Sequence, residues 1–326
     1  MPALTDSWTL GGVPLPNRVA LAPLAGIGTW FVRLQAFRHG AGLAFSEMVS
    51  SFGVHHGNPR TCTEMLRLHP EEGPVAVQLF GADPDIMRSA AERVAQAGAT
   101  LIDLNMGCPV AKVCKTGAGA ALLDEPDRAV AVARAAREGS GLPVTVKLRS
   151  GRAPGQRSGV VLAQRLAEEA GIAALSFHPR SAAVHHKGTP DYDLAAELVE
   201  ALPVPVLLSG GLRSPEQVER AFAHTGAAAI LLARGSLGDP WLFEQILGRR
   251  DGPPPAAEVL AELGWVMDRA EEHFGPRRAT GWMRKAYPWY LERFGAGKLL
   301  RDALMRAESL DLARAQLFAP ALSQAA

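Results

Sequence analysis

The sequence predicts an α/β fold, a (β/α)8 TIM barrel followed by a C-terminal helical domain. Two observations lead to this prediction. Eight short apolar segments lie between residues 18 and 235, and each is followed by a helix-like stretch. Near-continuous apolar runs of this kind are typical of strands buried on both faces of a parallel sheet. Eight such units match a closed barrel better than an open doubly wound sheet, which usually has fewer strands.

The expected strands are rich in Val, Leu and Ala, and a Gly, Pro or polar residue ends each of them. They begin at Arg18, Leu43, Pro74, Leu101, Pro143, Ala174, Pro205 and Ala228. Two of the intervening helices have clear start signals, because Asp83 and Ser214 are each followed by a proline. A capping side chain before a proline is a common helix start. We therefore expect helices over 83–97 and 214–223.

The segment 251–255, which reads Asp-Gly-Pro-Pro-Pro, predicts a linker. We assign 1–250 to a catalytic barrel and 256–326, whose pattern is helical, to a second domain. Within that domain, 277–306 carries eight basic residues against two acidic ones. The aromatic residues interleaved with them are Trp282, Tyr287, Trp289, Tyr290 and Phe294. We favour a packing role for the aromatics and polyanion binding for the basic face, with a solvated face as the alternative.

The composition excludes a disordered or fibrous chain, since 48% of the 326 residues are hydrophobic. A net charge of +1 gives no general attraction for nucleic acid, so a polyanion would need the local basic patch. The N-terminus lacks a signal pattern and no apolar run approaches the ~18 residues of a membrane span, so we expect a cytoplasmic protein without a membrane partner. Cys62, Cys108 and Cys114 suit neither a disulfide framework nor a structural zinc site, and we expect free thiols and no metal.

Polar residues follow the expected strands at the end where barrel enzymes build their active sites. They are Pro23, Glu47, Gln78, Asn105 with Cys108, Lys147, His178, Ser209 to Gly211, and Arg234. Lys147 could neutralise a reduced cofactor ring, and Gln78 could pair with an amide-like ring edge. The glycines after the seventh strand, with Arg234, suit a phosphate. The alternatives are a surface lysine at 147, a structural histidine at 178 and a surface ion pair at 234.

The most specific segment is 105–123, which contains Cys108 between a strand end and a glycine-rich turn. A thiol with an ordinary pKa of roughly 8.5 is protonated at neutral pH. Cys108 could therefore donate a proton, or act as a nucleophile if Lys112 and Lys115 lowered its pKa. Cys62 is interpreted as a small core residue, and the role of Cys114 stays open.

Asn105 to Pro109 reads Asn-Met-Gly-Cys-Pro, and 117–120 reads Gly-Ala-Gly-Ala. With Leu-Ala-Pro-Leu-Ala at 21–25 and Arg-Lys-Ala-Tyr-Pro-Trp-Tyr at 284–290, these motifs resemble the tRNA-dihydrouridine synthase family over nearly the whole chain. The resemblance implies an FMN-dependent enzyme that uses NADPH to reduce the C5–C6 bond of particular tRNA uridines to 5,6-dihydrouridine. In that reaction Cys108 would protonate C5 while hydride from reduced flavin reaches C6.

The resemblance also implies roles for other residues. Flavin contacts are implied for Pro23, Leu24, Ala25, Gln78, Lys147, His178, Ser209, Gly210, Gly211, Ala233 and Arg234. Asn105 would bind the uracil, and further contacts to tRNA are expected from Lys112, Arg180, Arg277, Arg278, Arg284 and Lys285. We expect a monomer.

Five positions depart from the family pattern. Leu24 replaces a usual Met, which should be nearly neutral, and Pro179 stands where Gly is frequent. Ser209 stands where Asn is common, Gly211 where an acidic residue is frequent, and Ala286 in place of a His.

Two other functions remain as alternatives. One is an FMN barrel oxidoreductase acting on a small molecule, like dihydroorotate dehydrogenases or ene-reductases. The other is a non-catalytic nucleotide- or RNA-binding barrel in which Cys108 is structural. The basic helical segment argues against the first, and the convergence of Cys108, Lys147 and His178 argues against the second.

Overall fold

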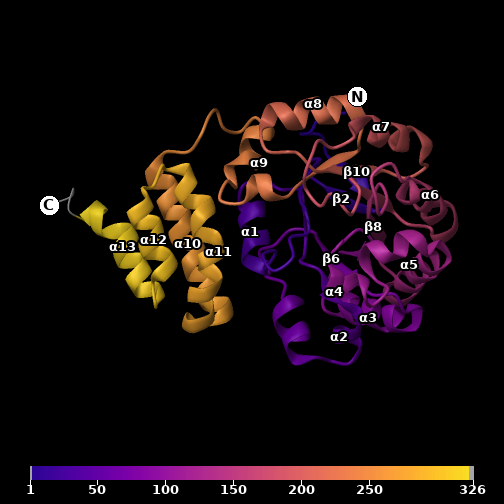
Figure 1. Ribbon diagram of the computed structural model, residues 1–326, viewed down its shortest axis with the longest axis horizontal. Helices are drawn as coiled ribbons and strands as arrows, with labels where there is room; N and C mark the ends of the chain where they lie inside the picture. Colours follow the sequence, from indigo (N-terminus) through magenta and orange to yellow (C-terminus); the bar gives the residue numbers. More distant parts are fainter. Residues whose placement is uncertain (1, 323–326) are drawn as a thin grey trace. The chain divides into compact units, whose positions relative to one another are not determined.

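The computed structural model describes residues 2–322 and contains the predicted closed parallel barrel (Figure 1). Its strands are β3 (Val19–Leu21), β4 (Leu43–Phe45), β6 (Val75–Phe80), β7 (Leu101–Asn105), β8 (Val144–Arg149), β9 (Ala174–His178), β10 (Val206–Ser209) and β11 (Ala229–Leu232). Each strand pairs with the next in parallel, and β11 pairs with β3 to close the ring. A short strand, β5 (Val49–Ser50), pairs with the end of β6. All eight predicted strands are confirmed.

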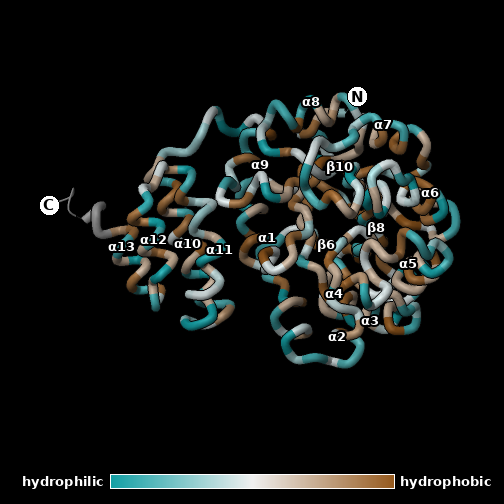
Figure 2. The backbone as a smooth tube through the Cα atoms, viewed as in Figure 1, coloured by the Kyte–Doolittle hydropathy of each residue, from teal (hydrophilic) through white to brown (hydrophobic). Residues whose placement is uncertain are grey.

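Helices cover the outside of the barrel, as Figure 1 shows for α3, α5, α6, α7 and α8. The helices of this part are α1 (Trp30–Arg38), α2 (Ser51–His55), α3 (Pro84–Gln96), α4 (Ala111–Cys114), α5 (Pro126–Ser140), α6 (Ser158–Arg165), α7 (Tyr192–Ala201) and α8 (Pro215–Thr225). Asp83 caps α3 by accepting from the amides of Asp85 and Ile86, and Ser214 caps α8. Both predicted helix starts are therefore confirmed. Figure 2 shows hydrophobic residues along the strands and hydrophilic residues along the outer turns.

A β-hairpin that the sequence patterns did not predict closes the amino-terminal end of the barrel. Its strands are β1 (Trp8–Leu10) and β2 (Val13–Leu15). Leu10 and Leu15 belong to one buried cluster with residues at the starts of the barrel strands, such as Leu43, Leu101 and Leu207. With this end filled by apolar side chains, the carboxyl ends of the strands are the place for polar chemistry.

The chain divides into two compact units between Ala233 and Arg234. The helices of the second unit are α9 (Trp241–Ile246), α10 (Ala256–Phe274), α11 (Pro276–Arg293), α12 (Lys298–Arg306) and α13 (Leu310–Leu322). The division lies before α9 because α9 is tied to α10: the Trp241 indole donates to Glu258 at 2.5 Å, and Arg250 bridges Glu244 and Glu258. Segment 251–255 contains no helix or strand, and we keep it as the proposed linker. Over residues 2–322 no helix combines the length and apolar character needed to cross a membrane.

Candidate active site

Three buried side chains form a layer across neighbouring strands inside the barrel. Gln78, Asp103 and Thr145 lie side by side in the registers of β6, β7 and β8. The Thr145 hydroxyl donates to Asp103 Oδ1 at 2.6 Å, and Gln78 Nε2 donates to Asp103 Oδ2 at 2.5 Å. Burial raises the pKa of the Asp103 carboxyl to about 6, although both hydrogen bonds oppose the shift. Asp103 is therefore ionised above pH 6 and acts there only as an acceptor.

Asn105 joins this layer to the cysteine loop. Its Nδ2 donates to Gln78 Oε1 at 2.9 Å. Its Oδ1 accepts from the backbone N–H of Cys108 at 2.9 Å and of Gly107 at 3.2 Å. Both ends of the Asn105 amide are thus used, and the backbone of Cys108 is held from the strand end.

The carbonyl of Cys108 is held from the other side. It accepts from the Ala120 amide at 2.9 Å and from the Cys114 thiol at 3.4 Å. Gly119, at a φ of 63°, lets the chain pass close by, since a Cβ there would lie 2.7 Å from this carbonyl oxygen. All three cysteines are free thiols, as expected. The role of Cys114 is therefore that of a hydrogen-bond donor to the loop rather than a disulfide partner.

Partial burial raises the pKa of the Cys108 thiol, and nearby Cys114 adds to this effect. The backbone N–H of Val110 opposes the shift, followed by the charges of Arg149 and Lys147. The thiol is therefore protonated at neutral pH. This favours the proton-donor role over the nucleophile role, which needed a lowered pKa.

Lys147 points into the barrel, as the strand alternation predicts. Its ammonium group donates to Ser209 Oγ at 3.3 Å, and Ser209 in turn donates to the carbonyl of Phe177. Burial is the largest cause that lowers the pKa of Lys147, to about 8, and the positive charge of Arg149 adds to it. Lys147 thus carries a charge at neutral pH that an anionic ligand would stabilise.

His178 is buried and neutral. Desolvation lowers its pKa, and the charges of Lys147, Arg149 and Arg180 add to this effect. Its Nε2 lies 3.1 Å from Arg180 Nη1. A guanidinium can only donate, so Nε2 accepts and the ring proton is on Nδ1. Arg180 also donates to the Gly188 carbonyl at 2.6 Å, which fixes the loop after β9.

The turn after β10 exposes backbone rather than side chains. Gly210 and Gly211 have φ values of 105° and 78°. A Cβ on Gly210 would lie 2.5 Å from His178 Nε2, so only glycine fits there. The Tyr192 hydroxyl donates to the Gly210 carbonyl at 2.7 Å and holds the turn in place.

The remaining predicted residues of the first unit lie at the same end of the barrel. Pro23, Leu24 and Ala25 follow β3, with Leu24 buried and Ala25 exposed. Ala233 ends the unit directly after β11, and Lys112 is exposed on α4. A pocket of about 430 Å³ opens between the loops after β8 and β9, and Arg157, Arg180 and Lys187 supply cations to its lining.

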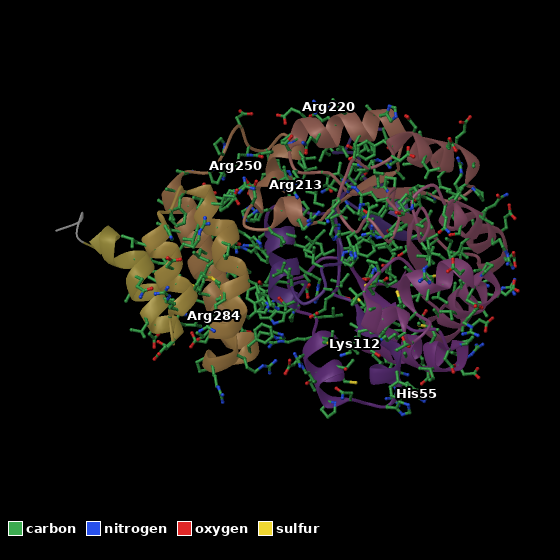
Figure 3. All side chains as sticks on the ribbon, in the orientation of Figure 1. His55, Lys112, Arg213, Arg220, Arg250 and Arg284 are labelled. Atoms are coloured by element: carbon green, nitrogen blue, oxygen red, sulfur yellow. The ribbon has the colours of Figure 1, made fainter. Side chains whose placement is uncertain are left out.

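The second unit presents a different surface. Arg277, Arg278, Arg284 and Lys285 are all exposed on α11, where Figure 3 labels Arg284. Trp282, Tyr287 and Tyr290 of the same helix are buried, which confirms the packing role of these three aromatics. Arg234 is exposed and begins the 3₁₀ turn Arg234–Ser236.

Three polar residues of the site, Asp103, Thr145 and Arg149, were not predicted from the sequence. Arg149 is buried and donates to the carbonyls of Ser181 and His185, so it supports the loop after β9. The signal that could have found them is the alternation of the strands, because Asp103 precedes Asn105 by two positions and Thr145 and Arg149 flank Lys147 by two.

Comparisons with known proteins show the family to which the chain belongs. Residues 20–326 match the sequence profile of the dihydrouridine synthase family (Dus). The chain is 35% identical over 307 residues to tRNA-dihydrouridine synthase B of Pseudomonas aeruginosa, a match that covers 93% of this chain and 92% of that protein. The chain belongs to the dihydrouridine synthase family. A further family member, probable tRNA-dihydrouridine synthase 1 of Synechocystis, is 33% identical over 92% of this chain and 85% of its own.

Solved structures of other proteins share the fold of this chain at lower sequence identity. An old yellow enzyme homologue from Zymomonas mobilis aligns with a TM-score of 0.58 at 16% identity, over 79% of this chain and 96% of its own. Morphinone reductase in complex with tetrahydroNAD aligns with a TM-score of 0.54 at 16% identity, over 79% and 94%. Both comparisons support the barrel.

Proposed function

We propose that this protein is a flavin-dependent tRNA-dihydrouridine synthase that reduces the C5–C6 bond of uridine in tRNA. Membership of the dihydrouridine synthase family supports this function. The observation that carries it is the arrangement of Cys108, which is held at both its N–H and its C=O while its thiol stays protonated. A base reduction needs one proton at one carbon, and a fixed neutral thiol suits that task.

The residues present fit a flavin mononucleotide. Gly210 and Gly211 offer bare backbone at the end of β10, which suits a phosphate. Lys147 offers a positive charge to the site, although burial lowers its pKa. This charge would stabilise a reduced flavin ring, which is anionic. His178 would donate through Nδ1, since its Nε2 is occupied by Arg180. We propose the contacts of Pro23, Leu24, Ala25, Gln78, Lys147, His178, Ser209, Gly210, Gly211, Ala233 and Arg234 to FMN on this basis.

Gln78 would contact the flavin with only part of its hydrogen-bonding capacity. One N–H bonds to Asp103 and one lone pair of Oε1 accepts from Asn105. One N–H and one lone pair remain for a ligand.

Reduced flavin, when bound, supplies the hydride for the uracil ring. Cys108 would donate its proton to C5, and the raised thiol pKa keeps that proton in place between turnovers. Asn105 would orient the uracil at the loop base with the second N–H of its Nδ2, which lies 3.9 Å from Met48 Sδ. NADPH is the proposed source of electrons for the flavin.

A uridine stacked in folded tRNA cannot reach the end of a barrel, so the base must leave its stack. Arg277, Arg278, Arg284 and Lys285 would hold the RNA backbone by charge. Lys112 beside the cysteine loop, and Arg180 beside the pocket, would contact the extruded nucleotide. We further propose that the enzyme acts in the cytoplasm as a monomer without a metal.

The test is reconstitution with defined components. Purified protein with FMN and NADPH should reduce unmodified tRNA, and mass spectrometry should find a gain of two hydrogens on specific uridines. Free uridine should be a poor substrate, because it lacks the backbone that α11 would bind. Protein that binds no flavin, or that reduces a small-molecule alkene but never tRNA, would contradict the proposal.

A further inference from the structure

The amides at the active site form a chain of hydrogen bonds that runs in one direction. From the buried end, Asp103 accepts from Gln78 Nε2, Gln78 Oε1 accepts from Asn105 Nδ2, and Asn105 Oδ1 accepts from the Cys108 amide. The three distances are 2.5, 2.9 and 2.9 Å. Gln78 and Asp103 are 1% and 0% exposed, so water cannot replace their partners.

Chemistry at the two ends fixes this direction. A backbone N–H can only donate, so Asn105 must turn its oxygen toward Cys108. An ionised carboxylate can only accept, so Gln78 must turn its NH₂ toward Asp103. Each amide between them has one orientation that satisfies both neighbours. Reversing either amide would place two acceptors or two donors face to face in a buried site.

Among the residues of this hydrogen-bond chain, Asp103 also has a partner outside it, because the Thr145 hydroxyl donates to its other carboxylate oxygen. Burying a carboxylate is unfavourable, and Asp103 is 0% exposed. Its presence therefore has to be explained by what it does for its neighbours.

We propose that Asp103 is a positioning residue: its carboxylate sets the direction of the Gln78 and Asn105 amides and, through them, the place of Cys108. The importance of Cys108 to the reaction rests on the proposed function, whereas the direction of the hydrogen bonds from Cys108 to Asp103 does not. Asp103 touches neither Asn105 nor Cys108 in this scheme and acts through Gln78.

The test uses variants that change donors into acceptors at nearly constant shape. Asn105→Asp places an acceptor against Gln78 Oε1, and Gln78 cannot turn because Asp103 faces its other end. Adding Asp103→Asn removes that conflict. In the double variant the new amide at position 103 donates to Gln78, Gln78 turns, and the new carboxylate at position 105 accepts from both Gln78 and Cys108. Asp103→Asn alone is tolerated, because the NH₂ of the new amide can turn to Thr145 Oγ1. The matched control is Asn105→Asp with Thr145→Val, which keeps the carboxylate at 103.

The measurement is the rate at which iodoacetamide alkylates Cys108 in the FMN-loaded enzyme at pH 8, followed by peptide mass spectrometry with Cys62 as the internal reference. Asn105→Asp should raise that rate about tenfold or more, because a carboxylate oxygen then faces Gln78 Oε1 and the bond that holds residue 105 to Gln78 is lost. The added Asp103→Asn should return the rate to near the wild-type value, and Thr145→Val should not.

Two results would overturn the inference: an Asn105→Asp enzyme whose Cys108 reacts at the wild-type rate, or a double variant with Asp103→Asn that reacts as fast as Asn105→Asp alone. If Asn105→Asp does not fold, Asp103→Leu replaces it, and its Cys108 should be alkylated about tenfold faster, because Gln78 has lost its acceptor. An unchanged rate there would also overturn the inference. These readouts need no turnover. The two proposals can fail separately. If the wild-type enzyme does not reduce tRNA, but Asp103→Asn returns the Cys108 alkylation rate of Asn105→Asp to the wild-type value, the proposed function is refuted and the inference stands.

Discussion

The carboxyl end of the barrel and helix α11 use polar residues in opposite ways. At the barrel end, Asp103, Gln78 and Asn105 are joined by short hydrogen bonds, and burial shifts the pKa values of Asp103 and Lys147. On α11 the cations are exposed. Transfer of a proton or a hydride requires one donor atom at a fixed position, whereas binding of a polyanion depends on the total positive charge of a surface. Substitutions at the barrel end should therefore change chemistry, and substitutions on α11 should change affinity and its dependence on salt.

The largest effect is expected at Cys108. Cys108→Ala should lower kcat for dihydrouridine formation by about 10²- to 10⁴-fold, the range that a general acid contributes. The dissociation constants for FMN and tRNA should not change, because the loop is held through its backbone. Cys62→Ala is the control and should keep full activity. Wild-type turnover by Cys108→Ala would contradict the proton-donor role.

The next effect is expected on α11. Reversing Arg277, Arg278 and Arg284 to Glu should weaken tRNA binding by about tenfold or more. It should also flatten the plot of log Kd against log salt by roughly 0.7–0.9 for each phosphate that the protein no longer neutralises. The matched control reverses Arg88, Arg134 and Arg220, which lie on the outer helices α3, α5 and α8 of the barrel. Equal decreases in affinity in both triple variants would show that total charge, and not α11, governs binding.

A smaller effect is expected from the titration of Lys147. Because its pKa is about 8, it is charged below pH 8 and neutral above, so FMN affinity should fall as pH rises above 8, by at most about tenfold per pH unit. Lys147→Arg should remove this dependence, since guanidinium stays charged. The stability of the protein without FMN should change in the opposite sense: the unfolded chain holds this proton more tightly, so stability should rise from pH 8 to 10.5. Measuring both trends across one pH series checks the assignment.

The smallest functional effect is expected at Ala286, where the family pattern has a His. Ala286 is 1% exposed, so Ala286→His should overpack α11, at about 1–3 kcal/mol. The thermal midpoint should fall by several degrees, while tRNA affinity of the folded protein stays the same. Tighter tRNA binding without loss of stability would show that position 286 faces RNA.

The sequence predicted the parts of the molecule that depend on local patterns. Strands such as β6 and β11 are mostly apolar runs, and the caps Asp83 and Ser214 act within their own helix turn. Lys147 was placed correctly because strand alternation fixes its direction.

The parts that were missed depend on interactions between distant segments. Asp103 looks like any polar residue in a strand until Gln78 and Thr145, 25 and 42 positions away, are seen to bond to it. The strands of the β1–β2 hairpin have three residues each, too few for a periodic signal.

The hairpin at the amino-terminal end of the barrel constrains the order in which the chain can fold. Leu10 and Leu15 pack in one cluster with Leu231, and the Arg18 guanidinium donates to the Ala228 carbonyl, 210 positions later. A ribosome releases the hairpin first, yet its binding surface is complete only after β11 has emerged. The packing of Leu10 and Leu15 is therefore complete only when Leu231 of the last barrel strand is in place, so the first and last segments of the barrel domain depend on one another.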